Sequence, residues 1–190
     1  VEMPSIPPGV GGLRLRDALL RELASLGVEM VENANVIGAQ VAEERCLSLK
    51  ISSTGRDYAA RAKAYVLATG GILAGGITLA PGSARERIFG LEIPLPEDVG
   101  AWTEPEIFGT HAVASLGVRV DGKLRPLDDN GALVLENVFF AGRTLGGHDP
   151  AVEKSGYGVA LATGWHAGLA AAQLAGASPC AGEAATGGKQ

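Results

Sequence analysis

The chain has 190 residues, is 46% hydrophobic and carries a formal net charge of −5 at pH 7, so it has the apolar content to build a folded domain. Its basic residues are scattered, which excludes the strongly basic surface of a nucleic-acid-binding protein. Only 5% of the residues are aromatic while 28 are glycine, a composition that favours an α/β fold over a β-sandwich.

Targeting and redox signals point to the cytoplasm. Cys46 and Cys180 match no metal-ligand or redox spacing, so we expect two inert thiols, a reducing compartment and no metal site. The first residues lack the basic and apolar regions of a signal peptide, and the missing initiating methionine suggests a fragment of a longer protein. The uncharged stretch 156–178 is predicted to be a buried core helix and not a membrane span.

The first third of the chain reads as a helix followed by short strands. Leucines at helical spacing predict an amphipathic helix over 12–26 that stops at Gly27, with a short strand over 28–31. Turn residues then separate three short segments that predict an antiparallel meander: 36–41, 47–52 and 57–62.

The next strand, 65–68, is apolar throughout, so we expect it to be parallel to a neighbour and covered on both faces. Four prolines, at positions 81, 94, 96 and 105, and the loss of periodicity predict a loop-rich insertion over 75–116. A hairpin is predicted over 117–124 and a buried strand over 138–141.

Asp149 and Pro150 predict the start of the last helix, which we expect to continue to about Leu174. Within it, Trp165 and His166 are expected to be core residues. We interpret Asp149 as a helix N-cap in preference to a catalytic acid.

Glycines follow the ends of two apolar strands, Tyr65–Ala68 and Val138–Ala141, and ligands of parallel sheets bind at such ends. Glycine lets backbone N–H groups approach a ring or phosphate, which predicts a flavin site. The N–H groups of Gly142, Gly146 and Gly147 are the expected donors. No Gly-x-Gly-x-x-Gly loop follows a strand, so FAD and FMN both remain open. The predicted cofactor-binding residues are Thr69, Gly70, Gly71, Gly142, Arg143, Leu145, Gly146, Gly147, Asp149 and Gly156.

Several of these segments resemble, in order and spacing over roughly residues 5–175, the B subunit of anaerobic glycerol-3-phosphate dehydrogenases. The most specific is Leu-Gly-Gly-x-Asp-Pro at 145–150, ahead of a glycine-punctuated helix. The other segments that carry the resemblance are 66–71, 88–91, 117–120, 124–126 and 141–142.

The resemblance implies a flavoprotein of the fumarate reductase and succinate dehydrogenase type, with an α/β, three-layer, partial dinucleotide-binding (Rossmann-like) fold that contains the meander and the insertion. It implies oxidation of glycerol 3-phosphate to dihydroxyacetone phosphate, with electrons passed to partner subunits A and C and the quinone pool. The B subunits are about twice this long, so the chain would correspond to their C-terminal half. The cytoplasmic assignment then includes attachment to the inner face of the membrane through the partners.

This chemistry needs a base for the hydroxyl proton and cations for the phosphate. We expect Arg85 and Arg87 to bind the phosphate and His111 or His148 to act as the base. In related flavoproteins an acidic residue often occupies the place of Arg143. A cation cannot accept a bond from a flavin hydroxyl, so we expect Arg143 to face a phosphate instead.

The predicted organisation has four parts. Residues 1–74 and 117–175 form the flavin-binding domain, 75–116 are an insertion on the substrate side, and 176–190 are a flexible tail. Two alternatives stay open: a non-catalytic subunit that keeps the flavoprotein scaffold, and another FAD-dependent dehydrogenase of the same fold. Self-association of the chain through an uncovered sheet edge also stays open.

Overall fold

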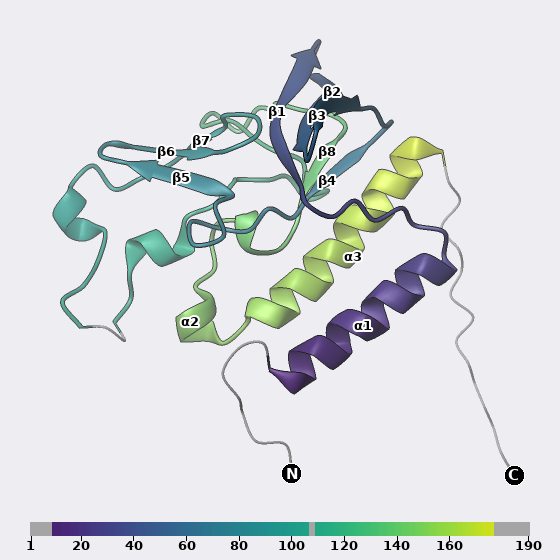
Figure 1. The fold of residues 1–190 in the computed structure, drawn as a ribbon. Helices are drawn as coiled ribbons and strands as arrows, with labels where there is room; N and C mark the ends of the chain where they lie inside the picture. The colour runs from purple at the N-terminus through teal and green to yellow at the C-terminus, as the bar shows by residue number, and fades with distance from the viewer. Residues whose placement is uncertain (1–8, 107–108, 177–190) are drawn as a thin grey trace, which may run out of the picture. The chain divides into compact units, whose positions relative to one another are not determined.

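The computed structural model describes residues 9–106 and 109–176, and the chain divides into two compact units, residues 1–34 and 35–190 (Figure 1). The predicted tail over 176–190 lies outside the described residues except for Gly176, which ends the last helix in the left-handed conformation, with φ +82°.

The described part of the first unit is one helix and an extended segment. Helix α1, Val10–Ser25, confirms the helix predicted from the leucine spacing, and Gly27 follows it at φ +70°. No residue of α1 is buried. The strand predicted over 28–31 is wrong, because these residues pair with no other strand and a strand requires a hydrogen-bonded neighbour.

The second unit begins with the predicted meander. Its strands are β1 (Ala34–Ala42), β2 (Arg45–Ser53) and β3 (Arg56–Ala60), in the order β1-β2-β3. β2 and β3 pair in antiparallel fashion from Leu49 opposite Ala60 to Ser53 opposite Arg56. Gly55, at φ +104°, makes the tight turn between them.

A parallel pair of strands, β4 (Tyr65–Leu67) and β8 (Val138–Phe140), forms the centre of the unit. The predicted parallel orientation is confirmed, with Val66 level with Phe139. The expectation that both faces of β4 are covered is wrong, because Val66 is 42% exposed. The last helix packs on Phe139 of β8 and leaves the neighbouring position on β4 uncovered.

The insertion contains more regular structure than its prolines predicted. β5 (Ile77–Ala80), β6 (Ser83–Glu86) and β7 (Glu92–Ile93) form an antiparallel sheet. Two 3₁₀ helices follow, η1 (Val99–Ala101) and η2 (Ala112–Ser115). The prolines lie between or after the strands, where no ladder hydrogen bond is needed, so they limit the strands' length without preventing the sheet.

The hairpin predicted over 117–124 is displaced. Val120 pairs with Pro126 in an antiparallel bridge around a turn that begins at Asp121, whose carboxylate accepts bonds from Lys123 N and Arg125 N, each at 2.9 Å. Val118 instead pairs in parallel with Leu145, which follows the second strand end.

The C-terminal part contains η3 (Gly142–Thr144), α2 (Pro150–Glu153) and α3 (Gly156–Ala175). The predicted continuous helix is therefore wrong, because Lys154 adopts a left-handed φ of +55° and breaks it. Trp165, 71% exposed, and His166, also exposed, are not core residues. Only Ala167 of α3 is buried, so the expectation of a buried core helix is wrong as well.

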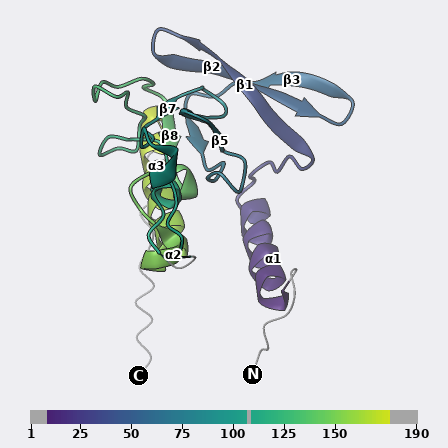
Figure 2. The same cartoon turned by 90° about the vertical axis from the view of Figure 1, so that its left-hand side faces the viewer.

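These elements stack in layers around β4 and β8. α3 runs along one face of the pair (Figures 1 and 2). On this face, Ala167 packs on Phe139 and Ala141. The opposite face, with Val138 and Phe140, joins a core to which the two antiparallel sheets contribute, among others, Cys46, Ile77, Ala84 and Ile93. The α/β class is confirmed, and the parallel pair supplies the two adjacent strand ends on which the predicted site depends.

Candidate functional site

The carboxyl ends of β4 and β8 are joined by one buried side chain. The Thr144 hydroxyl accepts a hydrogen bond from Gly70 N at 3.0 Å and donates to Gly70 O at 3.2 Å. Thr144 is fully buried. The structure therefore brings together the two strand ends that the sequence predicted to meet, and it does so through a residue that the sequence did not single out.

A second close contact joins the segment before Val118 to the glycines after β8. A Cβ on Gly117 would lie 2.2 Å from Gly146 N, so the two backbones meet at a distance that only glycine permits. Three hydrogen bonds follow the contact: Val118 N to Thr144 O at 2.8 Å, Gly146 N to Val118 O at 3.2 Å and Gly147 N to Ser115 O at 2.9 Å. These two glycines are needed for packing, whatever else they contact.

The same bonds correct the expected chemistry of the glycines. The N–H groups of Gly146 and Gly147 already have carbonyl acceptors within the chain, and Gly142 N donates to the Thr163 hydroxyl at 2.8 Å. Gly70 N is likewise bonded to Thr144. The predicted N–H donors are thus bonded within the chain and are not free for a ligand. A ligand can still pack against the exposed backbone of these glycines.

That surface is clearest at Gly147, which has a φ of +83° and open space around the position of a Cβ. Together with Gly117 and Gly146 it borders a cleft of about 510 Å³. The rest of the lining is largely apolar and consists of Ile93, Pro94, Ser115, Leu116, Val118, Arg119, Val120 and Leu127. An apolar cleft of this size with few polar groups is typical of a small-molecule or cofactor site.

The Arg143 guanidinium is hydrogen-bonded to backbone carbonyl groups. Its guanidinium donates to Leu116 O at 3.2 Å and to Ala114 O, while a Cβ on Gly71 would lie 3.1 Å from the Arg143 side chain. Burial lowers the pKa of Arg143, an effect that the nearby Asp149 carboxylate opposes. Arg143 therefore holds η2 next to the glycine segment, and these two bonds compete with the phosphate contact that we expected.

Asp149 acts as the predicted N-cap of α2, accepting from Ala151 N at 2.9 Å and Val152 N at 3.3 Å. Glu153 completes the cap by accepting from Asp149 N at 3.0 Å, and this bond and that from the Ser155 hydroxyl lower the Glu153 pKa. Gly156 lies at the start of α3, where a Cβ would meet Pro150 at 3.4 Å. His148 is half-buried between Gly147 and this cap.

The two arginines of the insertion have different surroundings. Arg85 pairs with Glu92 at 2.6 Å and borders a cleft that also contains Glu97 and Asp129, so its charge is offset there. Arg87 donates its backbone N–H to Gly76 O at 3.0 Å, and Gly76 packs directly on Gly70. Arg87 is therefore the one nearer to the strand ends, which favours it over Arg85 as a phosphate ligand.

His111 precedes η2, and its Nδ1 accepts a hydrogen bond from Glu104 N at 3.1 Å. With Nδ1 used as an acceptor, the neutral imidazole carries its proton on Nε2. In that tautomer it can donate a hydrogen bond but cannot take a proton at Nε2. The bond from Glu104 N therefore disfavours His111 as the base.

Sequence reasoning also missed two buried polar residues. Glu86 is 1% exposed, and its carboxylate accepts from Ile88 N at 2.9 Å and Phe89 N at 2.7 Å, while burial raises its pKa. It shapes the turn from β6 to β7. Because no strand was predicted over β6, nothing in the sequence placed Glu86 on an inward-facing position. Without that strand, an acidic residue between two arginines is interpreted as part of a solvated surface.

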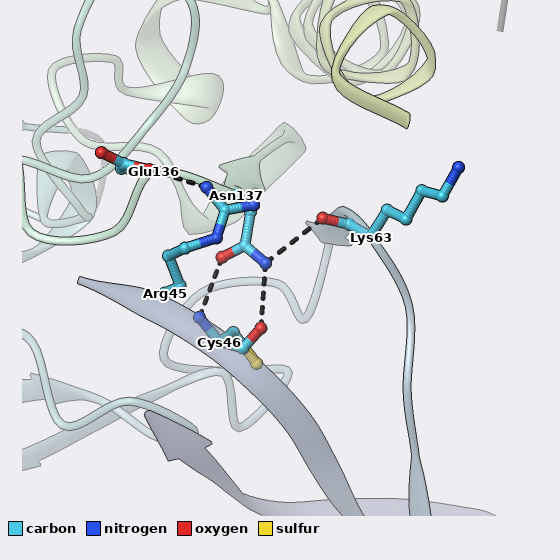
Figure 3. Close-up of polar contacts among 5 residues, drawn as sticks. All are labelled: Arg45, Cys46, Lys63, Glu136 and Asn137. Atoms are coloured by element: carbon cyan, nitrogen blue, oxygen red, sulfur yellow. Dashed lines mark hydrogen bonds and ion pairs between the residues drawn. The ribbon is translucent and has the colours of Figure 1, made fainter. Parts of the chain in front are cut away.

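Asn137, 2% exposed, lies at the opposite end of the parallel pair (Figure 3). Its Oδ1 accepts from Cys46 N at 2.8 Å, and its Nδ2 donates to Cys46 O at 2.9 Å and to Lys63 O at 3.3 Å (Figure 3). Beside it, Arg45 pairs with Glu136 at 2.7 Å. Asn137 thus ties the meander to the starts of β4 and β8, and no sequence pattern marks it.

Within residues 9–106 and 109–176, no three His, Cys, Asp or Glu side chains are arranged to hold a metal ion. In the same part of the chain, no helix is long and apolar enough to cross a membrane.

Comparison with known proteins now defines the class. Residues 1–159 match the FAD-binding domain family, and the chain belongs to that family. It is therefore a flavoprotein chain, and FAD is its cofactor.

The chain is also similar to individual proteins of known name. The chain is 40% identical, over 172 residues, to the probable B subunit of the anaerobic glycerol-3-phosphate dehydrogenase of Halobacterium salinarum, covering 90% of this chain and 40% of the relative. It is 30% identical over 168 residues to the corresponding B subunit of the Vibrio cholerae enzyme, covering 87% and 38%. The resemblance drawn from the motifs is confirmed, and the chain spans about two fifths of the relatives' length.

A solved structure, the thioredoxin reductase of T. acidophilum, is similar over 83% of this chain and 40% of that protein, with 14% identity and a TM-score of 0.24. This likeness is too small to bear on the details of the fold.

The described residues fit part of a flavin. An apolar cleft bordered by open glycine backbone suits the flat faces of a ring system, and no bulky side chain stands at Gly147. A Gly-x-Gly-x-x-Gly loop that would bind the pyrophosphate is absent from the sequence. The lining of the cleft therefore suits the flat ring system of a flavin.

Proposed function

We propose that this chain is the flavin-binding part of a dehydrogenase subunit that oxidises glycerol 3-phosphate to dihydroxyacetone phosphate. The observation that carries the proposal is the 40% identity to a glycerol-3-phosphate dehydrogenase chain over 90% of this one, together with the cleft at Gly147, inside the most specific shared motif. The flavin, when bound, supplies the hydride-accepting chemistry.

In this proposal the cleft formed by residues 115–120 and the glycines at 146–147 binds the flavin ring and excludes water from it. Thr144 and Arg143 keep the cleft in shape through their contacts with Gly70 and η2. The remaining predicted cofactor residues, Thr69, Gly71, Leu145 and Gly156, surround the strand ends and the start of α3. Asp149 contributes through the α2 cap.

On the substrate side, Arg87 binds the phosphate and His148 takes the hydroxyl proton. Arg87 is exposed and close to the strand ends, and His148 adjoins Gly147 at the cleft. Arg85 is less suited to bind the phosphate, because Glu92 offsets its charge. His111 is less suited to act as the base, because its Nδ1 already accepts a hydrogen bond from Glu104 N.

The relatives are named as subunits, which supports further subunits as electron acceptors. We propose that subunits A and C take up this role, passing electrons to the quinone pool, with the complex in the cytoplasm at the inner face of the membrane.

The first experiment is a titration of the purified chain with FAD and with FMN, followed by quenching of flavin fluorescence, using two matched variants. Gly147→Leu places a side chain in the cleft, whereas Gly131→Leu imposes the same left-handed strain, at φ +81° against +83°, outside it. We expect saturable flavin binding by the wild type and Gly131→Leu, and at least a tenfold loss in Gly147→Leu, equivalent to about 1.4 kcal/mol. Equal binding by both variants would exclude this cleft.

The second experiment tests the reaction under anaerobic conditions in the flavin-loaded chain. Glycerol 3-phosphate is expected to bleach the flavin absorbance, and Arg87→Gln is expected to weaken substrate binding more than Arg85→Gln does. Bleaching by a different hydroxy compound alone would identify another FAD-dependent dehydrogenase. A bound flavin that no such compound reduces would identify a non-catalytic subunit.

A further inference from the structure

Helix α3 exposes an apolar face that no described part of its own unit covers. Tyr157 is 94% exposed, Leu161 79% and Trp165 71%. These residues recur at every fourth position, so they lie on one side of the helix. The side that packs on β8 carries Thr163 and Ala167 and points the other way.

The exposed face lacks charge. Residues 156–175 contain no Asp, Glu, Lys or Arg, although the whole chain carries a net charge of −5. A contiguous uncharged surface with two aromatic side chains is typical of a protein–protein contact, since tyrosine and tryptophan are the residues most enriched at the energetic centres of interfaces.

The same face has a large half and a small half. Tyr157, Leu161 and Trp165 occupy its N-terminal and central part, while Gly164, Gly168 and Ala172 occupy its central and C-terminal part. Nothing lies within 4 Å of where a Cβ on Gly164 or Gly168 would be, so the two glycines leave open hollows on the helix surface.

This order makes the face complementary to itself. If a second α3 runs antiparallel about a two-fold axis between positions 164 and 165, Tyr157 meets Ala172, Leu161 meets Gly168 and Trp165 meets Gly164. Each large side chain then faces a small residue, and each contact occurs twice, as a two-fold interface requires. Glycines at the contact let the two helices approach closely.

We propose that this chain forms a two-fold dimer through the α3 face, with the partner's α3 antiparallel to its own. The two aromatic side chains of each protomer remove roughly 150–250 Å² apiece from water, or about 600–1,000 Å² over the pair before Leu161 is counted. That total lies below the roughly 1,200–2,000 Å² of stable specific interfaces and in the range of transient ones, so the dimer is weak and exchanges with the monomer at micromolar concentrations.

The test is sedimentation equilibrium of the wild-type chain over about a hundredfold range of concentration, because a reversible dimer dissociates on dilution. The mass is expected to rise from monomer to dimer. Trp165→Gln is expected to stay monomeric, whereas Leu73→Gln, a control at a fully exposed leucine outside the helix, is expected to dimerise like the wild type. A wild type that is monomeric throughout, or a Trp165→Gln variant that still dimerises, would overturn the proposal.

A second variant separates docking from folding. Gly168→Leu fills the hollow opposite Leu161 while replacing a helix-interior glycine with a better helix former, so the monomer's Tm should stay the same or rise. Loss of the dimer with an unchanged Tm supports the register. An intact dimer excludes it.

A disulfide trap tests the same register directly. Gly164→Cys lies next to the axis and is expected to cross-link to its counterpart on mild oxidation. Ala172→Cys is expected not to, since its counterpart is about 22 Å away along the helix axis at 1.5 Å per residue. Cross-linking of Ala172→Cys in preference to Gly164→Cys would show that the helices meet in another arrangement and would overturn the proposal.

Discussion

The two ends of the β4–β8 pair are held by different means. At the amino ends, the buried Asn137 amide makes three hydrogen bonds to the backbone of β2 and of the segment before β4 (Figure 3). At the carboxyl ends, Gly117 and Gly146 bring two backbones into direct contact, and Thr144 and Arg143 complete the junction. The end away from the predicted site is fixed by a buried amide, whereas the end that forms it combines the buried Thr144 hydroxyl with close backbone packing.

The difference matters because the two junctions fail in different ways. Removing a buried amide leaves backbone groups without partners, whereas adding a methyl group between two backbones forces them apart. The first change lowers stability and leaves the cleft residues in place. The second moves the wall of the cleft itself.

The largest effect is expected from Asn137→Ala, which leaves Cys46 N, Cys46 O and Lys63 O without the side-chain partner. We expect the free energy of unfolding to fall by about 3–4 kcal/mol. Denaturant unfolding measures it. Asn130→Ala, at an exposed position, is the control and is expected to change little; a loss below about 1 kcal/mol for Asn137→Ala would contradict the role of this amide.

A smaller loss, about 2–3 kcal/mol, is expected from Gly117→Ala, because the new Cβ would lie 2.2 Å from Gly146 N. Unlike Asn137→Ala, this variant should also weaken flavin binding at temperatures where it is still folded. Gly122→Ala, where nothing lies within 4 Å of the new Cβ, is the matched control for unfolding and flavin titration. Unchanged flavin binding in folded Gly117→Ala would show that the contact between Gly117 and Gly146 does not shape the flavin site.

Arg143→Met keeps the aliphatic contact with Gly71 but removes the bonds to Ala114 O and Leu116 O. We expect a loss of about 1–2 kcal/mol and faster amide hydrogen exchange confined to η2 and its flanks. Arg56→Met, an exposed arginine on β3, is the control. If exchange in η2 stays as slow as in the wild type, Arg143 does not hold this segment.

The smallest effect is expected from Arg45→Gln, which removes the ion pair with Glu136 beside Asn137. Both side chains are partly exposed, 41% and 47%, so the pair contributes only about 0.5 kcal/mol. Unfolding at low and high salt checks this, since screening should erase the difference between wild type and variant. A larger loss that salt leaves unchanged would mean that Arg45 belongs to the buried part of the junction.

Much of the fold could be read from local patterns. The leucine spacing of α1, the turn residues of the meander and the apolar runs of β4 and β8 each reflect a repeat or a turn that is encoded within a few residues. The same holds for the Asp149 cap. The insertion was harder, because strands as short as Glu92–Ile93 carry too few residues to show a period.

The meeting of the two glycine-rich strand ends was predicted correctly, whereas the hydrogen-bond partners of their glycines were not. The glycine-rich segments after β4 and β8 do meet, and the family comparison identifies the cofactor. The bond partners of Gly142, Gly146 and Gly147 could not be predicted, because their acceptors belong to residues 21, 28 and 32 positions away in the chain. The exposure of Trp165 was missed for a related reason, since an uncharged helix shows no polar side from which to read its orientation.

The sequence by itself determined the family, the α/β class, the parallel pair of strands and the glycine-rich segments that follow them, because each depends on short motifs and on periodicity. Only the tertiary structure decided that Asn137 and Thr144 join the strands, that Arg143 serves the backbone, and that one face of α3 stays bare. These depend on which distant segments pack together, and a side chain's role follows from the neighbours that packing gives it.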